Sequence, residues 1–229
     1  MAKLITKSVG IFEENIFEQC SKICNILTMS SNSTASSAPR SRKNPGRDLA
    51  LIAVFAAFIA VCALLPAFPV GPAGVPITFQ TLGIYLTALV LGGGRGFLST
   101  LLYVVIGLIG LPVFAGGGAG IGVLASPSAG YLLGFLPCAF VIGVLAHSFL
   151  RRRSGNTQLF IKLFLATLAG SVLLTTAGII GMVVNAHLSW GHAFAAALIY
   201  LPGDLIKCMV SVTVALAVHR AFPALARRS

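Results

Sequence analysis

The chain has 229 residues, of which 57% are hydrophobic and 9% charged, and its mean hydropathy is +0.95. Soluble domains carry about 25% charged residues, so this composition excludes an ordinary soluble enzyme and a disordered segment and indicates an integral membrane protein. The net charge of +11 does not indicate a nucleic-acid partner, because the basic residues stand singly or in short clusters between apolar runs.

Residues 1–48 differ from the rest of the chain. Apolar residues recur at three- and four-residue steps between Ile5 and Leu27, which predicts an amphipathic stretch, and residues 30–44 form a serine-rich, basic linker. Two interpretations stay open: residues 1–48 form a cytoplasmic N-terminal tail, or translation starts at Met29 and the amphipathic stretch lies upstream of it.

Residues 49–229 predict an all-α, polytopic membrane domain of six transmembrane helices. A spanning helix takes about 20 apolar residues, and glycine, proline or basic residues separate the apolar runs of this chain. The predicted helices are 49–67, 77–91, 96–113, 129–150, 163–184 and 193–219. The second is short, and Gly92-Gly93-Gly94 marks its end. Barrel strands would alternate in hydrophobicity over about ten residues, whereas these runs are apolar all round.

The basic residues predict the orientation, because cytoplasmic loops carry the excess of lysine and arginine. The connections 68–76, 114–128 and 185–192 contain neither. Basic residues instead precede the first predicted helix and follow the second, fourth and sixth: Arg40, Arg42, Lys43, Arg47, Arg95, Arg151, Arg152, Arg153, Lys162, Arg220, Arg227 and Arg228. We therefore expect an N-in/C-in topology, which accounts for every basic residue of the domain except Lys207.

Asp204 and Lys207 are the strongest chemical signal in the sequence. Ionisable groups inside a span cost several kcal/mol unless they are paired or face a polar cavity, and a spacing of three places both on one helix face. The preceding Leu201-Pro202-Gly203 predicts a kinked or locally opened helix that lines a cavity. The alternative is an ion pair that only ties helices together.

Further binding candidates lie in and beside the uncharged loops. The glycine-rich segment after Phe114 includes Gly116, Gly117 and Gly118, whose backbone can approach a ligand closely. Thr78, Gln80 and Thr81 add polar groups at the start of the second predicted helix, and Tyr131 adds a hydroxyl at the start of the fourth. Together these residues predict a capped cavity on the side without basic residues.

Other signatures are missing from the sequence. It contains no phosphate-binding P-loop and no Gly-x-Ser-x-Gly nucleophile elbow, so we expect neither ATP hydrolysis by this chain nor serine catalysis. His147 and His219 fall near the cytoplasmic ends of predicted helices, and we expect them to snorkel to the interface instead of binding a metal.

Small residues repeat along the first predicted helix and would let another membrane helix approach closely. They are Ala53, Ala56, Ala57 and Ala60. They indicate either a docking surface for a partner or packing against the other five helices.

Five segments, in this order, resemble the BioY family, the biotin-binding S components of energy-coupling factor (ECF) transporters. They are PAFPVGP (66–72) with VPITFQT (75–81), GLIGLPVFAGG (107–117), SPSAGYLLGF (126–135) and LPGDLIK (201–207). The resemblance implies a bacterial six-helix plasma-membrane protein, surrounded by lipid, that binds biotin near the outer face.

The resemblance also implies roles for particular residues and partners. Asp204 and Lys207 match the polar pair of the family's ligand site; Asp204 would accept from a ureido N–H, and Lys207 would donate to the ureido oxygen or to the valerate carboxylate. The first helix would dock on a transmembrane T component joined to two cytosolic ATPases, which alone use ATP, and no cofactor is expected. Two rivals remain: a pocket for another vitamin, and a membrane enzyme or small channel.

Overall fold

The computed structural model describes residues 45–66, 68–69, 75–151 and 155–222. The predicted amphipathic stretch, the linker and the alternative start at Met29 lie outside these residues. Residues 45–48, which we assigned to the tail, are instead the first turn of a helix. That helix begins at Pro45, where proline costs little because the first helical N–H has no partner within the helix.

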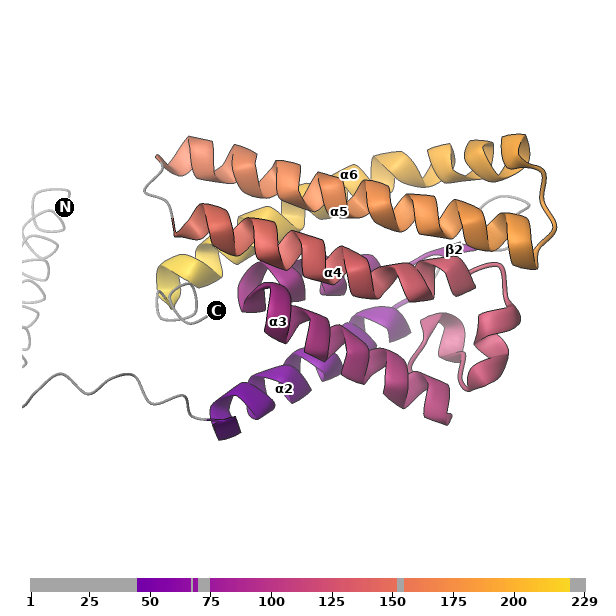
Figure 1. Cartoon of the computed structure of the whole chain (residues 1–229), viewed down its shortest axis with the longest axis horizontal. Coiled ribbons are helices and arrows are strands. Elements are labelled where there is room, and N and C mark those ends of the chain that lie inside the picture. The colour runs from indigo at the N-terminus through magenta and orange to yellow at the C-terminus, as the bar shows by residue number, and fades with distance from the viewer. Residues whose placement is uncertain (1–44, 67, 70–74, 152–154, 223–229) are drawn as a thin grey trace, which may run out of the picture. The chain divides into compact units, whose positions relative to one another are not determined.

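The described chain is a bundle of long helices, as the sequence predicts (Figure 1). In chain order its elements are α2 (Pro45–Leu64), β1 (Phe68–Pro69), β2 (Pro76–Ile77), α3 (Gln80–Ile109), the short 3-10 helices η1 (Ala115–Gly117) and η2 (Ile121–Ala125), α4 (Ala129–Leu150), α5 (Asn156–Asn185) and α6 (Trp190–Ala221). The two strands form one antiparallel ribbon in which Phe68 pairs with Ile77. The all-α fold class is therefore confirmed, with this ribbon as a small addition.

Helix α3 folds back on itself at Gly92. This residue has φ 84° and ψ −179°, which no helix contains. Gln80 Nε2 lies 2.8 Å from the hydroxyl of Tyr103, 23 residues later, a separation that would be about 35 Å in a straight helix. A Cβ on Gly96 would lie 3.0 Å from the Cα of Ala88. The predicted helices 77–91 and 96–113 are thus the two arms of one helical hairpin.

Five described helices are long and apolar enough to cross a membrane, with α3 counted as one of them. The hairpin in α3 explains why this number differs from the six predicted spans. Its first arm is only about 18 Å long at 1.5 Å per residue, and the turn at Gly92 is too short to separate the two arms into distinct elements.

Helix α6 runs from Trp190 to Ala221 as one helix with Pro202 inside it. Of the two alternatives predicted at Leu201-Pro202-Gly203, a kink or a locally opened backbone, the opening is therefore not formed. Proline removes one helical hydrogen bond, but in this bundle the remaining bonds keep the helix continuous. Ser189 caps its start by accepting from the backbone N–H of His192.

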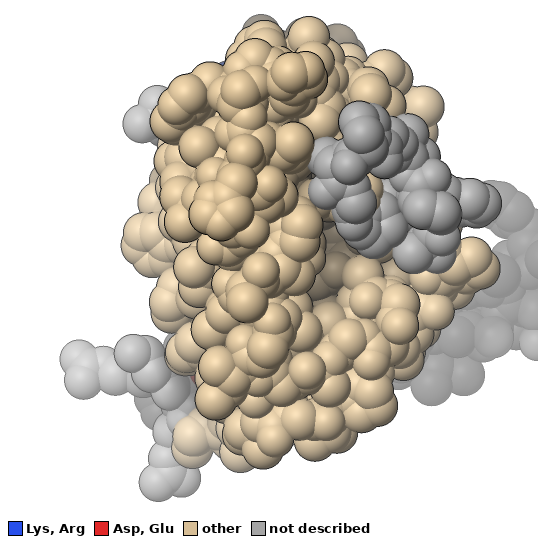
Figure 2. All heavy atoms as spheres, turned by 90° about the vertical axis from the view of Figure 1, so that its right-hand side faces the viewer, with Lys and Arg blue, Asp and Glu red and all other residues tan. Residues whose placement is uncertain are grey.

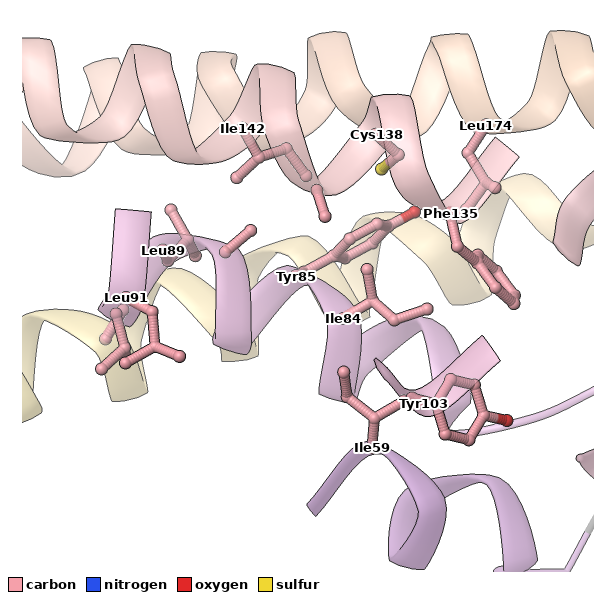
Figure 3. Close-up of a cluster of buried hydrophobic side chains, with 14 of the residues drawn as sticks. Ile59, Ile84, Tyr85, Leu89, Leu91, Tyr103, Phe135, Cys138, Ile142 and Leu174 are labelled. Atoms are coloured by element: carbon pink, nitrogen blue, oxygen red, sulfur yellow. The ribbon is translucent and has the colours of Figure 1, made fainter. Parts of the chain in front are cut away.

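The main hydrophobic core lies around α3, which packs against α2, α4 and α6. Figure 3 shows Ile84 and Tyr85 of α3 between Ile59 of α2 and the α4 side chains Phe135 and Cys138. The ring of Tyr85 is fully buried. The first arm of α3 is thus enclosed by other helices, which fixes the position of its N-terminal residues.

The prediction that His147 and His219 snorkel to the interface is wrong, because both side chains are buried. Their rings lie 6.0 Å apart in an edge-on arrangement. His219 Nε2 donates to the carbonyl of Leu89 at 2.9 Å. The break at Gly92 leaves the last carbonyls of the first α3 arm without helical partners, and His219 supplies one.

Candidate functional site

A cavity of about 330 Å³ lies among α3, α4, α5 and α6, the residues on either side of β2 and the connection between α3 and α4. Figure 2 views the end of the bundle at which α5 and α6 are connected, and it shows a hollow beside described residues that are almost all uncharged. Six predicted residues line the cavity: Thr78, Gln80, Gly118, Tyr131, Asp204 and Lys207. Small-molecule sites typically have about 300–1,000 Å³.

Asp204 and Lys207 face the cavity from α6 and pair with each other. Lys207 Nζ donates to Asp204 Oδ1 at 3.2 Å, and the side chains are 13% and 15% exposed, respectively. This single bond leaves donors on the ammonium and acceptor sites on the carboxylate. The pair is therefore neutral as a whole and can both accept and donate a hydrogen bond.

Gln80 presents its amide to the cavity in a fixed orientation. Its Nε2 donates to the Tyr103 hydroxyl at 2.8 Å, and this hydroxyl donates to the carbonyl of Val113 at 3.1 Å. Because this bond uses one of the two N–H donors of the amide, the second N–H and the carbonyl oxygen of Gln80 are left to bind a ligand. The same chain of bonds ties the α3–α4 connection to the second arm of α3.

Two hydroxyl groups at the cavity are buried and have no hydrogen-bond partner, those of Thr81 and Tyr131. The Tyr131 ring packs on Gly178 of α5 so closely that a Cβ there would overlap it. A buried hydroxyl without a partner costs about 1–3 kcal/mol. These groups are therefore suited to receive the polar atoms of a ligand.

The glycine loop contributes less to the cavity than we predicted. Gly118 lines it, whereas Gly116 and Gly117 do not. Gly116 and Gly117 have φ values of 68° and 77°, which disfavour residues with a side chain. Their role in the structure is to turn the chain so that Phe114, Ala115 and Gly118 face the cavity.

Sequence reasoning missed the apolar walls and one tyrosine. Thr81, predicted beside Thr78 and Gln80, also lines the cavity, and the lining residues not singled out as binding candidates are Val75, Phe114, Ala115, Val123, Ser126, Ser128, Leu132, Phe135, Leu174 and Tyr200. Tyr200 lies four residues before Asp204 on the same face of α6, a spacing that would have identified it. Its hydroxyl donates to the carbonyl of Val75 at 2.8 Å and thereby holds the segment before β2 against α6.

Among the described residues, no group of three His, Cys, Asp or Glu side chains lies in an arrangement suited to a metal ion. The cavity contains Asp204 alone of these residue types. The chemistry available there is hydrogen bonding around one ion pair.

The four alanines of α2 divide between two faces of the helix. Ala53 and Ala57 are exposed, whereas Ala56 is buried and Ala60 is partly buried against the main core. Each interpretation of the small-residue repeat therefore applies to two of the four alanines. Ala56 and Ala60 pack internally, and Ala53 and Ala57 are exposed on a face that another helix could approach.

The sequence model of the BioY family matches residues 31–224. The chain belongs to the BioY family. It is 37% identical over 184 residues to a biotin transporter BioY of Rhizobium etli, an alignment that covers 80% of this chain and 98% of the relative. A biotin transporter BioY of Rhodobacter capsulatus is 42% identical over 178 residues, covering 74% and 91%, respectively.

A solved structure supports the same assignment. The S-component for biotin from an ECF-type ABC transporter superposes with a TM-score of 0.71 at 28% identity, covering 79% of this chain and 94% of that one. The family resemblance read from the sequence is therefore confirmed. BioY proteins are transport components, so the expectation that the chain is not an enzyme is confirmed as well.

Proposed function

We propose that this chain is the biotin-binding, substrate-specific component of an ECF-type uptake transporter. The observation that carries the proposal is the neutral Asp204–Lys207 pair, which faces a cavity of about 330 Å³. Membership of the BioY family and the likeness to a biotin S-component support the identity of the ligand.

The chemistry of the pair matches the ureido group of biotin. That group is uncharged and carries N–H donors beside a carbonyl acceptor, while the pair offers a carboxylate acceptor beside an ammonium donor. In the proposed complex Asp204 accepts from a ureido N–H and Lys207 donates to the ureido oxygen. Apolar side chains such as Leu132, Phe135 and Leu174 line the same cavity and suit the sulfur ring and the aliphatic chain.

We further propose six membrane crossings with both termini in the cytoplasm of a bacterium. The two arms of α3 return the chain to the side from which it came, which supports counting them as separate crossings. Arg95 comes just after the turn at Gly92, and Arg151 comes just after α4. The connections at the cavity end lack Lys and Arg. This distribution agrees with a cytoplasmic excess of positive charge.

The proposed partners are an ECF transmembrane T component and two cytosolic ATPases, which supply ATP hydrolysis. Lipid surrounds the remaining helix faces, and neither nucleic acid nor a cofactor takes part. The exposed face of α2 with Ala53 and Ala57 supports docking of the T component there, because small residues allow close helix approach.

Titration calorimetry of the purified chain with biotin tests the proposal. We expect saturable binding of one biotin per chain. Asp204→Asn or Lys207→Met should weaken the free energy of biotin binding by about 2–5 kcal/mol, because each variant leaves one member of a desolvated pair without its partner. Arg220→Met, at an exposed basic position of the same helix, is the control and should bind normally. A folded wild-type chain that binds another vitamin but not biotin would contradict the proposed ligand.

A further inference from the structure

The wall formed by residues 123–128 is attached to the far end of α5 through Asn185. This residue is the last of α5. Its Nδ2 donates to the carbonyls of Leu124 and Ser126 at 2.8 and 3.0 Å, across 61 and 59 positions of sequence, respectively. Asn185 does not itself line the cavity, but Ser126 does.

The polar groups of this wall depend on the backbone that Asn185 holds. The Ser126 hydroxyl donates to the carbonyl of Val123 at 2.6 Å and lies 2.9 Å from the Ser128 hydroxyl. Val123, Ser126 and Ser128 all line the cavity. A shift of the Ser126 backbone therefore moves an apolar side chain and two hydroxyls of the site together.

The two halves of the α3–α4 connection are held by different helices. Tyr103 donates to the carbonyl of Val113, and the N–H of Gly120 donates to the carbonyl of Gly107 at 2.8 Å, so α3 holds the part up to Gly120. Asn185 holds the part beyond it from α5. Without Asn185, the second half would lose its two side-chain bonds to α5 while the first half stayed in place.

We infer that Asn185 is a positioning residue of the ligand site, whose amide keeps the 123–128 wall in place and slows ligand release. The part concerning release rests on the proposed biotin function. The part concerning the wall does not, because it concerns the ligand-free protein.

The test compares three variants of the full-length protein in detergent. Asn185→Leu removes the amide donors at similar size, Asn185→Gln keeps them, and Asn156→Leu makes the same change at the exposed first residue of α5. Hydrogen exchange of the ligand-free protein reports on residues 121–128, and stopped-flow or filter assays with labelled biotin report on release.

We expect faster exchange at residues 121–128 and about tenfold faster biotin release in Asn185→Leu, because two neutral hydrogen bonds are lost. Asn185→Gln should recover part of both effects, and Asn156→Leu should show neither. The thermal unfolding midpoint of ligand-free Asn185→Leu should fall only slightly, because Leu124 and Ser126 are only partly buried and water can bind their freed carbonyls.

Each contrary outcome has a distinct meaning. Unchanged exchange in Asn185→Leu would overturn the attachment, and faster exchange with unchanged release would overturn the role in binding. A large fall in the unfolding midpoint, with no rescue by Asn185→Gln, would reduce Asn185 to a structural residue. Absence of biotin binding by the wild type would instead refute the proposed function, and the exchange data would still test the attachment.

Discussion

Tyr131 and Tyr103 show how two hydroxyls near one cavity serve different purposes. The Tyr131 hydroxyl is buried and has no partner in the ligand-free chain. The Tyr103 hydroxyl accepts from Gln80 and donates to the carbonyl of Val113. The first is therefore suited to a ligand, whereas the second organises the protein before a ligand arrives.

We predict opposite effects on stability for Tyr131→Phe and Tyr103→Phe, although both should weaken biotin binding. Tyr131→Phe should leave the free energy of unfolding unchanged or raise it slightly, because an unsatisfied buried group is removed. Tyr103→Phe should lower it by about 1–3 kcal/mol, because two partners lose their bonds. Thermal unfolding in detergent and calorimetry on the same samples distinguish the two roles. Equal destabilisation by both variants would contradict this distinction.

The sequence alone identified the charged centre of the site but not its walls. Asp204 and Lys207 were predictable because charge inside a membrane span requires an explanation. Ser126 and Asn185 were not, because their contact joins residues about 60 positions apart and depends on how α5 meets the α3–α4 connection. Ordinary polar residues near helix ends carry no local signal of such a contact.

At the scale of elements, α2 has one face in the core and another that is open. Of an apolar 18-residue stretch of α2, 22% is buried, compared with 56% of such a stretch in α3. Ala56 is 4% exposed and packs in the main core, whereas Ala57 is exposed. Neighbouring alanines of one helix thus belong to different surfaces.

We predict that Ala57→Trp blocks assembly with the T component while biotin binding by the isolated chain persists. Ala56→Trp should instead destabilise the chain itself by about 1–3 kcal/mol or more, because the core has no room for the added ring. Copurification with the T component, together with calorimetry of the isolated chain, separates the two effects. An intact, active complex containing Ala57→Trp would show that this face of α2 contacts lipid.

The hairpin in α3 gives a second contrast between neighbouring residues. Gly92 has φ 84°, and a Cβ there would lie 2.9 Å from Nε2 of His147, whereas a Cβ on Gly94 would meet nothing within 4 Å. Glycines 92–94 predicted the break from sequence, but not which of them forms it. Contacts with α4 distinguish these glycines, because His147 packs against Gly92 and Val144 packs against Gly93.

We predict that Gly92→Ala destabilises the protein by about 2 kcal/mol or more, since it combines an unfavourable φ with a steric overlap. Gly94→Ala should have the opposite sign and stabilise it by up to about 1 kcal/mol, because alanine favours a helix. Denaturant unfolding of the two variants in the same detergent gives both values. A harmless Gly92→Ala would mean that the hairpin does not require a left-handed residue at this position.

For the whole molecule, the proposed orientation can be tested with two exposed positions. Gly122 lies in η2 at the cavity end, and Arg151 follows α4 at the other end. Both cysteine variants are made in a chain that also contains Cys20→Ser and Cys24→Ser, and each is expressed in intact cells. A membrane-impermeant thiol reagent should label Gly122→Cys from outside and Arg151→Cys only after lysis. Cys62, Cys138 and Cys208 are buried and should contribute little background. The reverse pattern would refute the N-in/C-in topology.

The overall architecture was largely predictable because each apolar run must satisfy its backbone hydrogen bonds within the membrane as a helix. Helices α4 and α5 were predicted near their observed positions for this reason. Of the kink or opening predicted near Pro202, the opening does not form, because proline removes one bond without requiring the rest of the turn to unwind. Contacts among the helices, which decide such cases, are not encoded in hydropathy.

The pairing of Asp204 with Lys207 also has an electrical consequence. A single charge moved through the full membrane potential changes in energy by about 2.3 kcal/mol per 100 mV. Because the two side chains carry opposite charges 3.2 Å apart, the field exerts almost no net force on them, and a tilt or shift of α6 in the bilayer moves almost no net charge. Any dependence of biotin uptake on membrane voltage would then come from the carboxylate of biotin or from the partner subunits, and not from the binding site.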